Sequence, residues 1–108
     1  MIVADYELNG GAVIRMLALE ERMDVVRHVV QAGRAAHERW VERVCGPLLA
    51  PGPRRRVQVL QFVVATDVYT WKLLRRDRHL SADEVVAVME DLCRRVAGDP
   101  TGVGGGKG

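Results

Sequence analysis

The sequence predicts an all-α fold: an antiparallel domain of about four helices that forms a dimer. Apolar residues recur at intervals of three and four along four segments, and no segment shows the strict alternation of a half-buried strand. Clusters of proline, glycine and charged residues separate these segments. With 108 residues, of which 48% are hydrophobic and 28% charged, the chain has room for one domain with a modest core, expected over residues 1–98.

The first two helices are expected over residues 3–21 and 24–44. Gly10 and Gly11 are a weak point of the first helix and could divide it, because glycine is a poor helix former. The second helix has the clearest apolar stripe, and Asp24 is its expected N-cap. The prolines of "CGPLLAPGP" end it, since proline cannot continue the hydrogen-bonded ladder.

The third helix is expected to run without a break from about Pro53 to about Asp77. Proline suits the first turn of a helix, where its missing N–H is not needed. The fourth helix begins with "SADE", in which Ser81 and Glu84 form a capping box, and it ends at Gly98, which can adopt the left-handed conformation.

The glycine-rich segment at residues 99–108 has almost nothing to bury, and we expect it to be a disordered tail. Its "GGGKG" lacks the Ser or Thr and the following helix of a phosphate-binding loop. Likewise, "HERWV" lacks the second histidine of a zinc protease motif. Because no catalytic, metal or cofactor motif is present, we expect neither an enzyme nor a cofactor.

Charge and cysteine content further limit the functions and locations that the sequence favours. Sixteen Lys and Arg against 14 Asp and Glu give a net charge of +2, which does not favour binding to nucleic acid. Cys45 and Cys93 lack metal-ligand spacing and lie among apolar residues, as expected of buried free thiols. The N-terminus does not resemble a signal peptide, and no apolar run approaches a membrane span of about 20 residues. The expected location is therefore cytoplasmic, without membrane contact.

Two polar residues lie on apolar helix faces and are candidates for a site. His37 lies one turn from Trp40, and Asp67 lies one turn from Trp71. A buried charge needs a partner, so we expect Asp67 to be largely buried and bonded to a donor on the second helix, with His37 or Trp40 preferred. The pair is either a satisfied core contact or the wall of a pocket. The ligand-binding candidates are His37, Trp40, Asp67, Trp71 and Met16, with Thr66, Tyr69 and Thr70 as weaker ones.

The apolar surface of the third helix is not confined to one face, and the fourth helix has a broad apolar face. One small core can hardly cover both. The sequence therefore predicts an isologous homodimer whose centre is a four-helix bundle built from the last two helices of each subunit. The expected interface residues are Val64, Val68, Val85, Val88, Met89, Leu92 and Val96.

Three blocks of sequence resemble the C-terminal effector-binding and dimerisation domain of TetR-family transcriptional regulators. They are "LALEER" (17–22), "GRAAHERWVERVCGPLL" (33–49) and "ATDVYTWKLLRRDRHLS" (65–81), followed by the amphipathic last helix. The resemblance covers residues 6–98 and implies a helical ligand pocket and dimerisation through the last two helices. Family members carry a helix-turn-helix domain ahead of this region, whereas here Met1 directly precedes the effector-domain helices.

The expected function is therefore that of a ligand-sensing and dimerisation domain of a TetR-like regulator, without its own DNA-binding domain. Its expected partners are a second copy of the chain and a small hydrophobic or amphipathic ligand, and we expect no DNA binding by this chain alone. The alternative is a structural helical dimerisation module with no ligand pocket.

Overall fold

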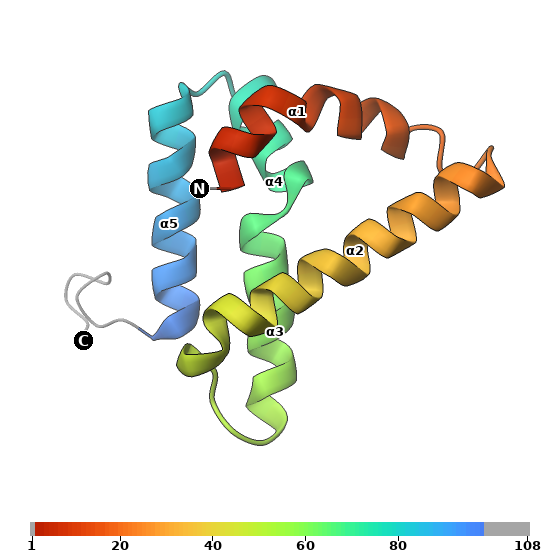
Figure 1. The fold of residues 1–108 in the computed structure, drawn as a ribbon. Coiled ribbons are helices and arrows are strands. Elements are labelled where there is room, and N and C mark those ends of the chain that lie inside the picture. Colours follow the sequence, from red (N-terminus) through yellow and green to blue (C-terminus); the bar gives the residue numbers. More distant parts are fainter. Residues whose placement is uncertain (1, 99–108) are drawn as a thin grey trace.

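The structure, a computed structural model, describes residues 2–98 and contains helices but no strands within them (Figure 1). This confirms the all-α prediction, while the expected tail at residues 99–108 lies outside the described part. The helices are α1 (Ile2–Leu17), α2 (Asp24–Cys45), α3 (Pro53–Thr66), α4 (Val68–Lys72) and α5 (Ala82–Ala97), with a 3₁₀ turn at Gly46–Leu48 and a π-helical turn at Leu73–Asp77. None of these helices is both long and apolar enough to cross a membrane.

Three sides of a triangle make up most of the fold (Figure 1). Helices α1 and α2 meet at one corner through the turn at residues 18–23, and the column formed by α3 and α4 makes the third side. Helix α5 runs antiparallel to α3 and also contacts α1. The triangle therefore leaves α1 and α2 in contact with different parts of the same column.

Most helix ends follow from local chemistry. The Ser81 hydroxyl accepts a hydrogen bond from the Glu84 amide at 3.1 Å, and the Glu84 carboxylate accepts one from the Ser81 amide at 2.9 Å, which confirms the capping box. Gly98 ends α5 with φ 77°, and Pro53 opens α3, both as predicted. The expected cap at Asp24 is wrong: the N-cap is Met23, and Asp24 lies in the first turn.

The glycine pair does not divide α1. At Gly10 the helix presses directly against the Trp71 ring, so that a Cβ added at this position would lie only 2.6 Å from the ring carbon Cζ3. Glycine here therefore permits a close approach between α1 and α4, and this contact outweighs its low helix propensity.

The expected continuous third helix is wrong, because the chain breaks at Asp67. This residue adopts an extended conformation, with φ −74° and ψ 152°, and its carboxylate caps the next helix by accepting a hydrogen bond from the Tyr69 amide at 2.8 Å. Aspartate favours such a position because its side chain competes with helical backbone bonds. Asp67 is therefore a helix N-cap within an apolar segment.

Side-chain hydroxyl groups donate to two carbonyl groups beside the break, those of Thr66 and Val64, and the Val64 carbonyl also accepts a hydrogen bond from the Asp67 amide at 3.3 Å. The Tyr6 hydroxyl of α1 donates to the Thr66 carbonyl at 2.8 Å, and the Thr70 hydroxyl donates to the Val64 carbonyl. Buried carbonyl groups need such partners, since an unpaired one costs about 1–3 kcal/mol. The bend between α3 and α4 is therefore held by α1 as well as by its own residues.

The core consists of two clusters. One joins α1, α4 and α5 through Val3, Tyr6, Val68, Trp71, Val85 and Met89. The other joins α2 and α3 through Val41, Cys45, Val59 and Phe62. The corner between α1 and α2 contains no buried residue of either cluster, although the half-buried Val13, Ile14 and Leu17 of α1 pack against the first cluster.

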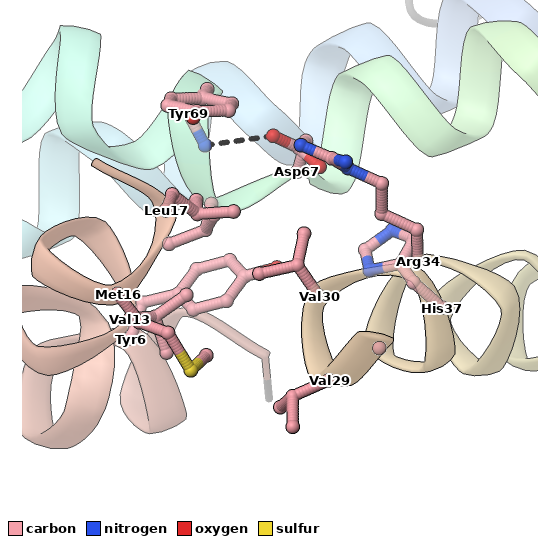
Figure 2. Close-up of a pocket in the computed structure, with 12 residues that line it drawn as sticks. Tyr6, Val13, Met16, Leu17, Val29, Val30, Arg34, His37, Asp67 and Tyr69 are labelled. Atoms are coloured by element: carbon pink, nitrogen blue, oxygen red, sulfur yellow. Dashed lines mark hydrogen bonds between the residues drawn. The ribbon is translucent and has the colours of Figure 1, made fainter. Parts of the chain in front are cut away.

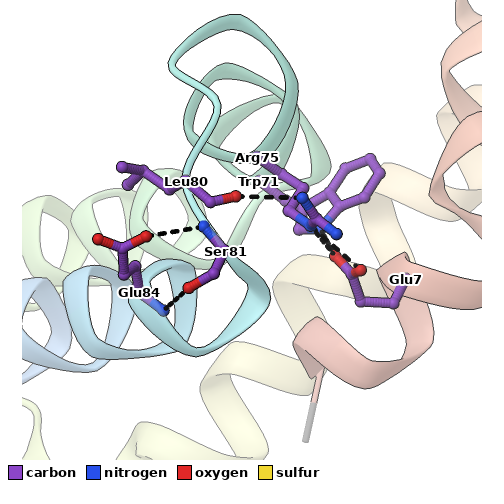
Figure 3. A network of polar contacts seen from close by, with 6 residues as sticks. All are labelled: Glu7, Trp71, Arg75, Leu80, Ser81 and Glu84. Carbon is purple, nitrogen blue, oxygen red and sulfur yellow. Dashed lines mark hydrogen bonds and ion pairs between the residues drawn. The ribbon is translucent and has the colours of Figure 1, made fainter.

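A polar network ties α1 to the turn before α5 (Figure 3). The Glu7 carboxylate accepts a hydrogen bond from Trp71 Nε1 at 2.6 Å and from Arg75 Nε at 3.2 Å. Arg75 also donates to the Leu80 carbonyl at 3.1 Å, directly before the capping box of α5. The network fixes the first half of α1 relative to α4 and the start of α5.

Candidate ligand-binding cavity

A cavity of about 300 Å³ lies inside the triangle, between the second half of α1, the first half of α2 and the junction of α3 with α4 (Figure 2). Its wall is mostly apolar, with a few polar groups on the sides of α2 and the junction. The lining residues are Tyr6, Val13, Met16, Leu17, Val29, Val30, Gly33, Arg34, His37, Asp67, Val68 and Tyr69.

Three of the five predicted ligand-binding residues, namely Met16, His37 and Asp67, line this cavity. The other two do not. Trp71 is 3% exposed and fills the core beside Gly10. Trp40 lies one turn beyond His37 and lines neighbouring cavities instead. Each tryptophan lies one turn after a residue that lines the cavity, Trp40 after His37 and Trp71 after Asp67. At that position each side chain is already beyond the end of the cavity.

The expected pairing of Asp67 with α2 is also wrong. The side-chain bond of Asp67 within residues 2–98 is the cap to the Tyr69 amide, and the carboxylate is only half-buried. His37 pairs instead with the preceding residue, since its Nε2 lies 2.8 Å from Thr66 Oγ1. The two helices are linked as expected, but through Thr66.

The protonation of His37 follows from this contact. Thr66 Oγ1 donates its hydrogen to the Phe62 carbonyl at 2.7 Å, so it accepts a hydrogen bond from Nε2–H of His37. In the neutral ring, Nδ1 is then an acceptor. Burial lowers the pKa of His37 from its ordinary value, and the nearby Asp67 carboxylate opposes this shift, so the ring is neutral at pH 7.

Arg34 reaches the cavity from α2 but is committed to Glu20. Its two terminal nitrogens lie 2.6 and 3.0 Å from the two carboxylate oxygens of Glu20, which follows α1. This bidentate bond raises the pKa of Arg34 and lowers that of Glu20. The pair closes the corner of the triangle and adds no net charge to it.

The remaining wall was only partly predictable. Val29, Val30 and Gly33 belong to the same apolar stripe as His37, and Val13 and Leu17 belong to the stripe of α1. The spacing therefore identifies the faces, but it cannot show that the two faces remain apart. Tyr6 and Arg34 had no signal in the sequence that separated them from core and surface residues.

The predicted interface divides into two groups. Val68, Val85 and Met89 are 8%, 0% and 1% exposed and belong to the subunit's own core, so their assignment to a dimer interface is wrong. A helix that is apolar on a broad face gives no signal of which side packs inward. The other four residues, Val64, Val88, Leu92 and Val96, remain exposed or half-buried.

An apolar groove lies between α3 and α5 on this outer side. Its volume is about 440 Å³, and it is lined by Val57, Leu60, Gln61, Val64, Ala65, Leu92 and Val96. Val64, in the last turn of α3, is 65% exposed although valine is among the residues most often buried. We call this surface the α3–α5 face.

Metal binding finds no support within residues 2–98, where no three potential ligand side chains come together. Cys45 is buried and Cys93 half-buried, and both are free thiols. Burial raises the pKa of each thiol, so both are protonated at pH 7.

No known protein family, curated protein or solved structure gave a significant match to the chain.

Proposed function

We propose that the chain is a ligand-sensing and dimerisation domain of the kind found in TetR-like transcriptional regulators. The observation that carries the proposal is the cavity between α1, α2 and the α3–α4 junction. It combines an apolar wall with converging polar groups, as small-molecule sites do. The resemblance of residues 6–98 to effector domains of that family supports the same function.

The size of the cavity indicates the size of the ligand. About 300 Å³ is at the lower end of the range for small-molecule sites, so the ligand is a small hydrophobic or amphipathic compound. Such a ligand would contact Met16 and Leu17 on α1 and Val30 on α2 at the same time. Binding would therefore favour one spacing of these helices over others, which is the requirement for a population shift.

Gly33 provides a direct test of the cavity. It lines the cavity, and a Cβ added there would meet no atom within 4 Å. We expect Gly33→Phe to fill the space and abolish ligand binding while the fold remains intact, and Gly33→Ala to bind nearly as well as the wild type. A screen of small apolar compounds by thermal shift, followed by titration of both variants, measures this. Equal binding by Gly33→Phe would place the ligand elsewhere.

We also propose that the α3–α5 face joins two copies of the chain. An isologous contact brings the residues at its two-fold axis near their own equivalents, so a charge at the centre of the contact would face a like charge. The face carries Val64, Leu60 and Leu92, and no charged residue lines its groove, whereas Arg94 and Arg95 of α5 are paired with Asp91. A stable dimer of this kind would bury on the order of 2,000 Å².

Two matched substitutions test the dimer. Val64 and Val25 are both highly exposed, at 65% and 72%, but Val25 lies at the start of α2, away from the α3–α5 face. We expect Val64→Asp to produce folded monomers and Val25→Asp to remain dimeric, as measured by sedimentation at micromolar concentration. A monomeric wild-type chain would refute the dimer. Met89→Asp is unsuitable, because Met89 is buried in the core.

A helical dimerisation module without a ligand is the alternative function. It requires only the α3–α5 face and leaves the cavity as a packing defect. The two functions differ in the Gly33→Phe variant, because filling an unused cavity would raise stability or leave it unchanged and would alter no binding reaction.

A further inference from the structure

Within residues 2–98 the Asp67 carboxylate forms no ion pair, although the Arg34 guanidinium lies near enough to interact with its charge. Its oxygen Oδ2 accepts the cap bond from the Tyr69 amide. Oδ1 accepts no hydrogen bond from these residues, and no buried polar side-chain atom lacks a partner, so Oδ1 is reachable by solvent. The dipole of the short helix that Asp67 caps offsets only part of a full negative charge.

The cations near the cavity are already paired. The Arg34 guanidinium lies near Asp67 (Figure 2), but both of its terminal nitrogens donate to Glu20. Arg27, which also acts on Glu20, forms its ion pair with Asp24 at 2.9 Å. His37 is neutral. Among the lining residues the charges of Arg34 and Asp67 cancel, but Glu20 binds Arg34 from outside the lining, so Arg34, Glu20 and Asp67 together carry a net charge of about −1 at pH 7.

The aromatic groups around the cavity are consistent with a negative field. The pKa of Tyr6 is raised, first by burial and then by the nearby carboxylates of Asp67 and Asp5. Tyr69 lies two residues after Asp67, to which its amide is bonded, lines the cavity and is 49% exposed. An aromatic ring beside a carboxylate attracts a cation through its π face as well as through the charge.

We propose that the cavity is selective for organic cations: compounds with an apolar body and a protonated amine that pairs with Asp67. This inference rests on the proposed ligand-binding function and names the chemical class of the ligand. The apolar body lies against Met16, Leu17 and Val30, and the ammonium group donates to Oδ1 of Asp67. A carboxylate ligand is disfavoured, because it would meet Asp67 while Arg34 is held by Glu20.

Three probes that differ only in their polar end test the inference: 4-phenylbutylamine, 4-phenylbutan-1-ol and 4-phenylbutyrate. At pH 7 the first is a cation, because the pKa of such an amine is about 10. Binding is measured by NMR titration of the ¹⁵N-labelled chain. We expect the amine to bind about tenfold more tightly than the alcohol, since a hydrogen bond between charged groups exceeds a neutral one by about this factor. The carboxylate should bind most weakly.

Asp67→Asn is the matched variant. Asparagine caps a helix as well as aspartate does, so the α3–α4 junction is retained and only the charge is removed. In this variant we expect the advantage of the amine over the alcohol to disappear, because the side chain no longer carries the charge that favours an ammonium group. Retention of that advantage in Asp67→Asn would refute the role of Asp67.

The outcomes separate the two proposals. Equal binding of amine and alcohol, abolished by Gly33→Phe, would leave the ligand site in place and overturn the selectivity for cations. Tightest binding of 4-phenylbutyrate would overturn it too and would indicate that Arg34 leaves Glu20 for the ligand. If no probe binds, or if Gly33→Phe does not affect binding, both the selectivity and the cavity as ligand site are wrong.

Discussion

The two halves of α1 carry the same apolar spacing but meet different surroundings. In the first half, Val3, Tyr6 and Gly10 pack against the buried Trp71, with no space left for a single added Cβ at Gly10. In the second half, Met16 and Leu17 face a cavity of about 300 Å³. The difference lies in what each half faces. Trp71 of α4 fills the space beside the first half, whereas the second half faces Val29, Val30 and Gly33 of α2 across the cavity. Core and candidate site are therefore distinguished by what fills the space, and not by hydrophobicity.

The largest expected effect comes from two aromatic residues on either side of this boundary. Trp71 is 3% exposed and Tyr69 49%, although only two positions separate them on α4. We expect Trp71→Ala to lower the free energy of unfolding by about 3–5 kcal/mol, because it empties the core and leaves Glu7 without its indole partner. Tyr69→Ala should cost less than about 1 kcal/mol and weaken ligand binding. Urea denaturation measures the free energy of unfolding of both variants. Similar losses in the two would contradict the distinction between a filled core at Trp71 and an open cavity at Tyr69.

Smaller effects are expected from alanine at Gly10 and at Gly33, and the two should have opposite signs. Gly10→Ala places its Cβ 2.6 Å from the Trp71 ring, so we expect a net loss of about 1–2 kcal/mol in spite of the better helix propensity. Gly33→Ala meets no atom within 4 Å and should stabilise the chain by up to about 1 kcal/mol. Thermal unfolding of both variants tests this. Stabilisation by Gly10→Ala would show that the contact between α1 and Trp71 is loosely packed.

The smallest effect concerns pH and His37, which lies between the two regions. Its pKa in the folded chain is lowered from 6.5 by burial, so the unfolded chain binds this proton more readily. The stability contributed by neutral His37 is therefore complete above about pH 6.5 and decreases as the pH falls toward the lowered folded pKa. His37→Gln can keep the bond to Thr66 but does not titrate. The variant should lose less stability than the wild type between pH 7 and 5. Identical pH profiles of stability would contradict a buried, neutral His37 in the folded chain.

Local chemistry made part of this fold predictable from the sequence. The Ser81–Glu84 capping box, the proline at the start of α3 and Gly98 at the end of α5 are short-range signals, and all three are confirmed. The break at Asp67 was missed because the apolar spacing continues from α3 into α4. The polar pair of Thr66 and Asp67 was the available signal, since both side chains compete with helical backbone bonds.

The candidate site was harder to predict, because it depends on space between helices. Periodicity placed Met16, His37 and Asp67 on inward faces, but it also placed Trp40 and Trp71 there. In α5 it could not separate Met89, which packs inward, from Leu92, which lies on the α3–α5 face. Helix faces follow from the sequence, whereas the distance between two faces depends on the crossing of the helices and on long-range contacts such as that of Tyr6 with Thr66.

The central claim is that ligand binds between α1 and α2, and methyl-selective NMR tests it most directly. The neutral probe 4-phenylbutan-1-ol is added to a chain labelled at valine, leucine and methionine methyl groups. We predict shifts at Val13, Met16, Leu17 and Val29, with Val41, Val59 and Val85 of the core unchanged. Shifts confined to Val57, Leu60 and Leu92 of the α3–α5 face, or no shifts at all, would contradict the claim.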